Sequence, residues 1–370
     1  MKETRPRISV VITCFNYARY VGQAIESALG QGYDAAEIVV INDGSTDGSL
    51  DVIMRYAAHL RVIDQPNQGW VHAYNRGFAE SRGDVVIFLD ADDVLDPGSL
   101  SAIALHWSPS CAKVQYDLRV IDANGADLSR TVCSFTPDYD ATRVRRLFET
   151  TGTYRWPMTA GNAYSRWFLE AVMPMEQHGP DGFLNTIAPL YGEVLTIPRP
   201  LAAYRIHAKN GWSSSGSDFR RLPERILHRR REIATLRVHA ERRHFGLPAG
   251  NILDNELVFV NYRLMAWRLG LPYEGQAEDT PYRLFLRAWN LVASEGYSRR
   301  FAMTHRVWFA AMLVSPRPMA RELFRIRFDR VRWQAAGRKR LRHLYDLLTA
   351  ATPQNKSMTD EQNMRGETVT

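Results

Sequence analysis

Three carboxylates stand directly after an apolar run in the first third of the chain. The run, residues 85–89, precedes Asp90, Asp92 and Asp93. It is typical of a buried strand, and burying like charges at its end is costly unless a cation neutralises them. Carboxylate oxygens are natural ligands of Mg²⁺ and Mn²⁺, which commonly lie between a few protein carboxylates and substrate phosphates. The pattern therefore indicates a divalent-metal site, although an acidic turn that caps the next helix fits these residues equally well.

Asp43 closes an earlier apolar run in the same way, at residues 37–43. Around the two aspartates, β-branched runs at 8–13, 37–43, 61–65 and 85–90 alternate with helical patterns at 20–31, after residue 45 and at 71–81. This alternation predicts right-handed crossovers and a parallel sheet, in which ligands bind at the carboxyl ends of the strands. We therefore expect Asp43 and Asp90 at one rim, while an Asx-turn in NDGS is a second role open to Asp43.

Composition indicates where the protein acts. Its 370 residues are 45% hydrophobic, enough for one large core or two smaller ones. Cys14, Cys111 and Cys133 form no disulfide or zinc pattern, which favours a reducing compartment. The amino-terminal segment lacks a signal-peptide core, and the longest late apolar run, 307–314, is too short to span a bilayer. We expect a cytoplasmic protein that does not span the membrane.

Charge and pattern divide the chain after residue 215. Residues 1–215 carry a net charge of −5 and residues 216–346 carry +13, which suggests two domains, the second facing something anionic. Within the first, 113–122 and 192–207 are expected to form strands, 141–150 a helix and 207–218 a mobile loop. We therefore predict an α/β domain at 1–215, a basic helical domain at 216–350 and a disordered tail at 351–370.

Three segments together resemble a known family. VVITCFNYARYVGQAIESALGQ, EIVVINDGSTDGS and NQGWVHAYNRGFAESRGDVVIFLDADD occur in the order and spacing of the inverting family 2 glycosyltransferases of GT-A fold. The likeness covers roughly residues 6–215. It implies a GT-A domain with a mostly parallel central sheet. It also implies transfer of a sugar from a nucleotide-diphosphate sugar, with a UDP-sugar favoured, to an acceptor hydroxyl.

The resemblance also assigns residues on the donor side. Asp43 resembles the aspartate that hydrogen-bonds the base, and Asp92 matches the ligand of Mn²⁺ or Mg²⁺, with His207 of YRIH completing the metal site. Many members have an arginine where this chain has Tyr74, and Arg76 is the candidate to replace it. The remaining expected donor contacts are Thr13, Phe15, Asn16, Asn67, Asp90 and Ala91.

The catalytic base is expected just before a helix-like run at 183–190. Asp181 is our candidate because it stands at the matching distance from YRIH, and Glu176 is its rival. A base must reach the acceptor hydroxyl with a suitable pKa, although an aspartate at this place can also simply cap the helix. The resemblance places acceptor contacts at Trp156, Gly161, Asn162 and Trp212; either tryptophan could equally belong to the core.

Two absences shape the expected function. The chain has neither the Gln-x-x-Arg-Trp motif nor the transmembrane segments of processive synthases, so addition of a single sugar to a saccharide or lipid-linked acceptor is expected, in surface polysaccharide or glycolipid synthesis. The alternatives are an inactive scaffold of a polysaccharide assembly complex and a nucleotidyltransferase. For the latter, TCFNYARY lacks the usual Gly-rich phosphate loop.

The basic second half has no recognised motif. Its arginines are either an ordinary solvated face or a docking surface for anionic lipid, reached peripherally at the inner face of the plasma membrane. In the docking case, Val307, Trp308, Phe309 and Leu313 are expected to enter the lipid interface. No nucleic-acid-binding module accompanies the charge, so nucleic acid is not an expected partner. The oligomeric state stays open.

Overall fold

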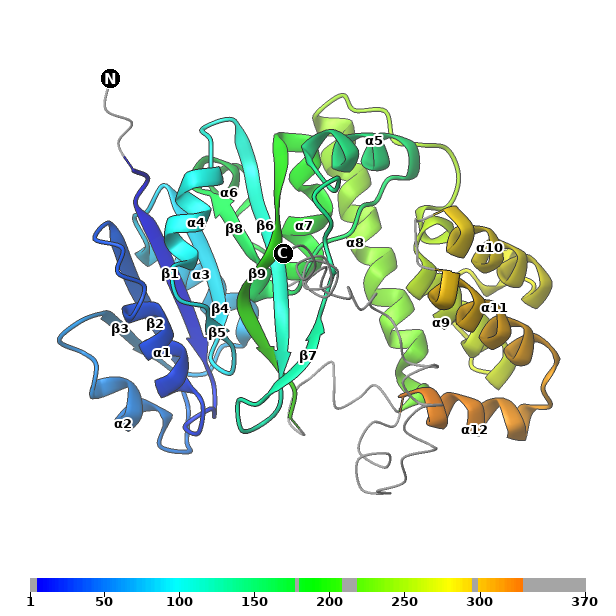
Figure 1. The fold of residues 1–370 in the computed structure, drawn as a ribbon, viewed down its shortest axis with the longest axis horizontal. Helices are drawn as coiled ribbons and strands as arrows, with labels where there is room; N and C mark the ends of the chain where they lie inside the picture. The colour runs from blue at the N-terminus through cyan, green and yellow to red at the C-terminus, as the bar shows by residue number, and fades with distance from the viewer. Residues whose placement is uncertain (1–4, 177–179, 208–217, 295–298, 329–370) are drawn as a thin grey trace, which may run out of the picture.

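The structure, a computed structural model, describes residues 5–176, 180–207, 218–294 and 299–328. A large sheet lies at one end and a group of helices at the other, with a long helix between them (Figure 1). The first half of the sheet alternates strand and helix as the sequence predicted. Its elements are β1 (Ile8–Cys14), α1 (Val21–Leu29), β2 (Ala36–Asp43), α2 (Ser49–Met54), β3 (Arg61–Gln65), α3 (Trp70–Glu80) and β4 (Val85–Asp90).

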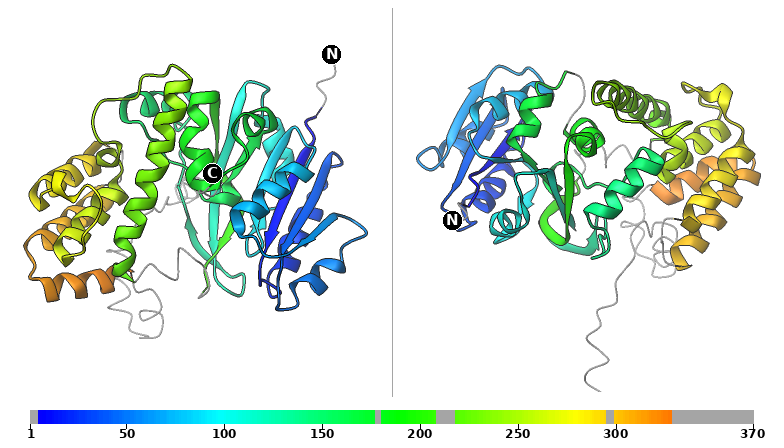
Figure 2. Two further views of the ribbon diagram at one scale, coloured as in Figure 1. Left: turned by 180° about the vertical axis from the view of Figure 1, so that it is seen from behind. Right: turned by 90° about the horizontal axis from the view of Figure 1, so that it is seen from above.

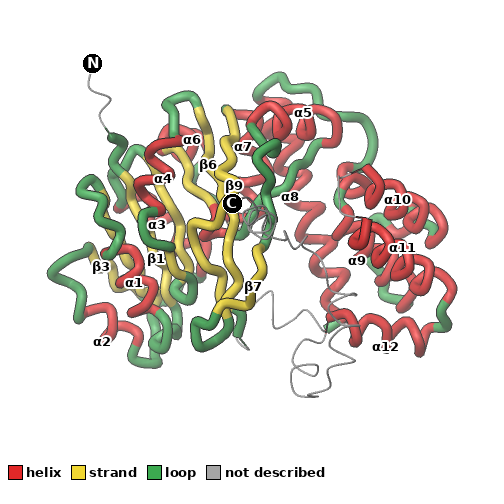
Figure 3. The backbone as a smooth tube through the Cα atoms, in the orientation of Figure 1, coloured by secondary structure: helices red, strands yellow, loops and turns green. Residues whose placement is uncertain are grey.

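The second half of the sheet is less regular. It adds two long strands, β6 (Cys111–Ile121) and β9 (Glu193–Arg205), together with three short strands and the helices that connect them (Figure 3). Its other elements are β5 (Val94–Leu95), α4 (Ser99–His106), β7 (Asp127–Thr131), α5 (Ala141–Thr151), β8 (Asn162–Ser165), α6 (Arg166–Val172) and α7 (Pro180–Tyr191).

The strands form one mixed sheet in the order β3-β2-β1-β4-β8-β6-β9-β5, with β7 on the edge of β6. β1, β2, β3 and β4 pair in parallel. β8 is antiparallel to both β4 and β6, so β6 runs parallel to β4, and β9 runs parallel to β6. In the described part of the chain, six of the nine strands therefore point the same way, which confirms the expected mostly parallel sheet.

Alternating side chains of β1 build two cores, one on each face of the sheet. Ile8, Val10 and Ile12 pack with α1 and α4 on one face, whereas Val11 packs with α3 and α7 on the other. Such alternation follows from the two-residue period of a strand. Gly77 lets α3 approach β1 closely, because a Cβ at this position would lie 2.2 Å from the Cγ1 of Val11.

The expected strand at 192–207 is one long strand despite two prolines. β9 pairs with β6 from Glu193 to Arg205, but the register shifts between the pairs Tyr116↔Ile197 and Asp117↔Pro200. Proline has no N–H to give to a ladder, so the two prolines in this stretch sit where pairing is interrupted. The segment thus keeps one direction and carries the chain back to the rim where β4 ends.

A bundle of helices follows the sheet. Its members are α8 (Leu222–Arg242), α9 (Leu257–Leu269), α10 (Pro281–Ser294), α11 (Arg299–Val314) and α12 (Arg317–Phe328). Trp308 and Phe309 lie in its core, 2% and 0% exposed. The expectation that these two residues face a lipid surface is therefore wrong, because both fill the interior of the bundle. Val307, which directly precedes Trp308, is 61% exposed.

The long helix α8 belongs to both halves of the molecule. Leu222 and Ile226 in its first turns pack in the bundle core. Ile233, Leu236 and Ala240 further along pack in the core beneath the sheet, and both views of Figure 2 show α8 beside α7. The proposed boundary after residue 215 thus precedes a helix that contributes to the core of the α/β part. The expected mobile loop and tail lie outside the described residues, except at the loop's ends.

Candidate active site

The expected donor residues meet at the carboxyl ends of the central strands. Thr13 of β1 lies opposite Asp90 of β4 in the ladder, and Asp43 ends β2 on the other side of β1. Ala91 follows Asp90 and is buried. Parallel strands bring their carboxyl ends to one edge, so the sequence reasoning placed these residues at the correct rim.

Asp43 organises the loop that leads from β3 to α3. Its Oδ1 accepts hydrogen bonds from the Gln65 side chain at 2.7 Å and from the Gln68 N–H at 3.0 Å, and its Oδ2 accepts one from the Gly69 N–H at 2.9 Å. A carboxylate has about four acceptor sites, so this leaves capacity for a ligand. Asn67 lies over the strand end, where its N is 2.6 Å from the position of a Cβ on Gly44.

Asn16 and Phe15 shape the end of β1. Asn16 has a positive φ of 61°, which asparagine tolerates better than most residues. Its Oδ1 accepts a hydrogen bond from the Thr46 N–H at 2.7 Å, and its own N–H donates to the Ser45 hydroxyl at 3.0 Å. These bonds join the loops after β1 and β2, and the neighbouring Phe15 ring is left 45% exposed at the strand end.

The acidic cluster lies where β4 meets the end of β9. His207 Nε2 is 2.8 Å from Asp92 Oδ2, and Asp93 accepts a hydrogen bond from the Arg205 N–H at 2.9 Å. Arg205 is buried, and its Nε donates to the Asp92 carbonyl at 2.7 Å. Burial and the charge of Asp92 raise the pKa of Asp90 to about 6, and the same two causes raise the pKa of Asp93 well above its usual range. Burial and mutual repulsion therefore both disfavour full ionisation of these carboxyls.

Tyr74 takes part in the site directly. Its hydroxyl donates a hydrogen bond to Asp90 Oδ1, and the ring is 4% exposed against Phe88. Arg76, the expected replacement for the missing arginine, lies two residues later on α3. Its guanidinium is half exposed and pairs with Glu80 at 2.7 Å. The structure thus brings Tyr74, and not Arg76, into contact with the strand end.

The donor set at the rim fits a divalent ion. Asp92 and His207 offer a carboxylate oxygen and an imidazole nitrogen that already lie within contact of each other, and both groups are ligands of Mn²⁺ in proteins. Among the described residues, no group of three or more His, Cys, Asp or Glu side chains could hold an ion alone. An ion bound here would therefore draw its other ligands from substrate phosphates and water, as Mg²⁺ commonly does.

Asp181 lies in the first turn of α7, facing the rim. Its Oδ1 accepts a hydrogen bond from the Thr159 hydroxyl at 2.6 Å. Burial raises the pKa of Asp181 to about 7, and the charges of Asp90 and Glu232 add to this rise. Glu176, its rival, has an exposed side chain. The environment therefore gives Asp181 a pKa suited to a general base near neutral pH.

The expected acceptor residues differ in what they can reach. Trp156 lies between the Tyr154 ring at 5.1 Å and the Arg229 guanidinium at 4.8 Å. Gly161 and Asn162 are buried; a Cβ on Gly161 would lie 2.5 Å from Pro157. Asn162 binds protein groups through both ends of its amide. The structure thus places these two residues in the interior, next to the segment that carries Thr159. Trp212 lies outside the described residues.

Sequence reasoning missed a buried lysine under the site. Lys113 Nζ donates to Asn162 Oδ1 at 3.0 Å and to Asn185 Oδ1 at 2.7 Å, and burial holds its pKa well below the usual range. Asn185 lies one turn after Asp181 on α7 and also accepts from the Tyr164 hydroxyl at 3.0 Å. The network therefore fixes the helix that carries Asp181. A lysine inside the apolar segment CAKVQY was the available signal.

Two further residues that the sequence did not single out come from α8. Glu232 Oε1 would lie 1.6 Å from a Cβ on Gly182, the residue after Asp181. Arg229 is buried and binds Glu232 at 2.7 Å, Glu256 at 2.6 Å and the Thr186 hydroxyl at 2.6 Å. The basic helix thus places a buried ion-pair network directly against the start of α7.

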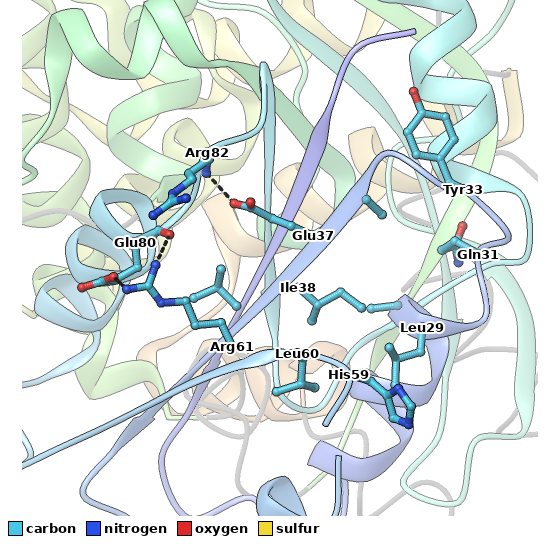
Figure 4. Close-up of a pocket in the computed structure, with 13 residues that line it drawn as sticks. Leu29, Gln31, Tyr33, Glu37, Ile38, His59, Leu60, Arg61, Glu80 and Arg82 are labelled. Carbon is cyan, nitrogen blue, oxygen red and sulfur yellow. Dashed lines mark hydrogen bonds and ion pairs between the residues drawn. The ribbon is translucent and has the colours of Figure 1, made fainter. Parts of the chain in front are cut away.

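A separate hollow of about 600 Å³ lies at the opposite end of the sheet (Figure 4). It opens beside the amino ends of β2 and β3 and is lined by residues such as Tyr33, Glu37 and His59. Its charged groups bind one another: Arg61 pairs with Glu80, and Glu37 accepts from the Arg82 N–H. The hollow holds none of the residues of the acidic cluster, so it is distinct from the candidate site.

Comparison with known proteins identifies the family to which this α/β chain belongs. The model of the family described as Glycosyl transferase family 2 matches residues 9–160. An uncharacterised glycosyltransferase of Nostoc sp. is 36% identical over 220 residues, which cover 57% of this chain and 68% of that protein. This chain belongs to glycosyl transferase family 2. The predicted family and the GT-A-type α/β fold with a helical carboxyl-terminal part are confirmed.

Other relatives are more distant. The putative glycosyltransferase EpsH of Bacillus subtilis is 25% identical over 232 residues, and the match spans 61% of its length. The mannosyltransferase PcManGT of Pyrobaculum calidifontis, solved with GDP-Man and Mn²⁺, has a TM-score of 0.48 at 17% identity, with 89% of each chain covered.

None of the helices in the described ranges is long and apolar enough to cross a membrane.

Proposed function

We propose that this protein is a non-processive inverting glycosyltransferase. It moves one sugar from a nucleotide-diphosphate sugar, with a UDP-sugar favoured, to a hydroxyl of a saccharide or lipid-linked acceptor, in surface polysaccharide or glycolipid synthesis. The observation that carries the proposal is the position of Asp181. Asp181 is half-buried, desolvation and the nearby charge of Asp90 raise its pKa to about 7, and it shares the rim with Asp92 and His207.

The reaction is a single displacement. Asp181 accepts the proton of the acceptor hydroxyl while the hydroxyl oxygen forms a bond to the anomeric carbon. The bond from that carbon to the diphosphate oxygen breaks on the opposite face, so the configuration inverts. Thr159 holds Asp181 through its hydroxyl, and Lys113 holds α7 from below through Asn185. The base is thus fixed before the acceptor arrives.

The donor side binds and orients the nucleotide. Asp43, with capacity left on its carboxylate, is the proposed partner of the base, and the exposed Phe15 ring is placed to stack on it. Asp90 is proposed to bind near the ribose. A divalent ion held by Asp92 and His207 would offset the charge that develops on the diphosphate.

The reaction takes place on the cytoplasmic side of the membrane in this proposal, near an anionic lipid surface where lipid-linked acceptors lie. Two alternatives are less well supported. An inactive scaffold would not need a half-buried carboxyl with a raised pKa beside an intact acidic cluster. A nucleotidyltransferase is disfavoured because the chain belongs to a glycosyltransferase family.

The test is to incubate the full chain with a panel of nucleotide sugars and candidate acceptors in Mn²⁺, and to measure release of the nucleoside diphosphate. The product's anomeric configuration, determined by NMR, should be opposite to that of the donor. Asp181→Asn should lower the rate of transfer by about 10²–10⁴, while Glu176→Gln, the matched control, retains the wild-type rate. Retention of configuration, or loss of activity in the control alone, would overturn the mechanism.

A further inference from the structure

The outer sides of α10 and α11 form an exposed apolar surface. On α10 the apolar side chains recur at i, i+4 and i+7, and on α11 at i, i+4, i+7 and i+11, so each set lies along one side of its helix. Their large members are exposed by between 36% and 77%. We name this surface the α10–α11 face; its residues are Tyr282, Leu286, Trp289, Met303, Val307, Ala310 and Val314.

This surface is not left over from an incomplete core. The opposite sides of the same helices are filled: Leu284, Ala288 and Trp308 lie in the bundle core. Sixteen large hydrophobic side chains are exposed in the described part of the chain, and six of them belong to the α10–α11 face. Such a concentration on a soluble surface marks an interaction site more often than chance exposure.

A groove runs between the two helices. It has a volume of about 600 Å³ and is lined by Trp289, Met303, Val307 and three neighbours. The Arg306 guanidinium lies 4.7 Å above the Trp289 ring, which combines an apolar ring and a cation at one point. Tryptophan and arginine are both suited to the boundary between headgroups and acyl chains. In Figures 1 and 2 both helices lie at the end of the molecule away from the sheet.

The charge of these helices indicates what the surface binds. α10 and α11 contain five arginines and no acidic residue. Arg283 is neutralised by Asp254 and Asp279, whereas Arg306 lies in the groove itself. A second copy placed face to face would bring the Arg306 of one copy close to that of the other, which opposes self-association through this surface. An anionic bilayer is complementary to both the apolar side chains and the arginines.

We propose that the α10–α11 face docks on an anionic lipid bilayer. Trp289, Met303, Val307 and Val314 enter the interface, and Arg306 remains at the level of the headgroups. This inference goes beyond the proposed transfer reaction and does not depend on its catalytic step, because binding to vesicles requires no turnover. It replaces the sequence expectation that Trp308 and Phe309 face the lipid.

The test is sedimentation of the full chain with vesicles of phosphatidylcholine alone or with about 30% phosphatidylglycerol. We expect binding to the anionic vesicles at about 0.1 M salt and release at about 0.5 M, where charge is screened within a few ångströms. Trp289→Ser with Val307→Ser should weaken binding about tenfold or more. The single variant Val307→Glu should also weaken binding, because it places a negative charge against the anionic lipid. Val307 is 61% exposed, so this substitution should leave the fold intact.

Leu105→Ser is the matched control, because Leu105 is 83% exposed on α4, far along the chain from the α10–α11 face, and it should bind as the wild type does. Donor turnover without lipid should be equal in all variants. Equal binding to neutral vesicles, absence of binding at low salt, or wild-type binding by Val307→Glu would each overturn the proposal. The proposal would also be overturned if light scattering showed a dimer of the wild type and a monomer of Val307→Glu, because a second copy would then occupy this face.

Discussion

The pH dependence of transfer should follow the environment of Asp181. Burial raises its pKa to about 7 from 3.8, and a general base acts in its deprotonated form. The active fraction should therefore be about one half at pH 7, about one tenth at pH 6 and about one hundredth at pH 5. A carboxyl with the ordinary pKa would keep the rate nearly constant across this range. A steep fall of the transfer rate below pH 7 would therefore show that the pKa of Asp181 is raised.

A substitution of Glu232 tests whether the surroundings of Asp181 raise its pKa. The Glu232 carboxylate lies against Gly182. Its charge contributes to the rise in the pKa of Asp181, although burial and the charge of Asp90 contribute more. Glu232→Gln keeps the size of the side chain and removes the charge. The acid limb should then move to lower pH, by about one unit or less, because Arg229 already pairs with this carboxylate and weakens its effect.

The assay is kcat/KM for the acceptor, with saturating donor and Mn²⁺, from about pH 5 to about pH 9. Glu224→Gln is the matched control, because Glu224 lies on the same helix with its side chain 65% exposed, and its limb should coincide with that of the wild type. A wild-type rate that stays constant down to pH 5 would refute the assignment of the base. A Glu232→Gln enzyme that is slower at every pH, with the limb unmoved, would show that Glu232 acts through packing alone.

Three further outcomes are expected. Asp181→Asn should lower kcat by about 10²–10⁴ yet stabilise the fold at pH 8 by on the order of 1–4 kcal/mol in denaturant unfolding. A carboxyl whose folded pKa is raised loses stability as pH rises from about 4 to 7, so the two proteins should converge below pH 4. Asp92→Ala should abolish the part of nucleotide binding that EDTA removes, measured by calorimetry; unchanged Mn²⁺-dependent binding would contradict the assignment. Tyr74→Phe, which deletes the hydroxyl bonded to Asp90, should raise the donor KM several-fold with little change in Tm, and an unchanged KM would remove Tyr74 from the donor site.

The sequence predicted the rim well because the rim depends on local patterns. Apolar runs ending in Asp43 and Asp90 become strands wherever helices alternate with them, and parallel pairing then brings their ends together. The pairing of Thr13 with Asp90 follows from that single rule. The same reasoning gave β6, α5 and β9, since each has its own periodic run.

Other parts depend on contacts between distant segments and leave no periodic trace. β8, four residues long, enters the sheet between β4 and β6 in the opposite direction. Arg229 and Glu232 appear in the sequence as members of a solvated, charged helix, yet both are buried. Glu232 lies about fifty residues after Asp181, so a single sequence offers no signal that joins them. Lys113 was visible as a charge in an apolar strand, but its partners were not.

The way in which the acidic cluster is neutralised explains why Asp92→Ala and Tyr74→Phe should weaken nucleotide binding by different amounts. Asp92 contacts the imidazole of His207, a group that can share a metal ion with it, whereas Asp90 accepts a hydrogen bond from the uncharged hydroxyl of Tyr74. A hydroxyl orients a carboxylate but leaves its charge in place. In the proposed function, a cation that comes with the donor would therefore neutralise this cluster. Loss of Asp92 should consequently weaken nucleotide binding far more than loss of the Tyr74 hydroxyl, and the reverse order would mean that the hydroxyl, and not an ion, makes this rim acceptable to a diphosphate.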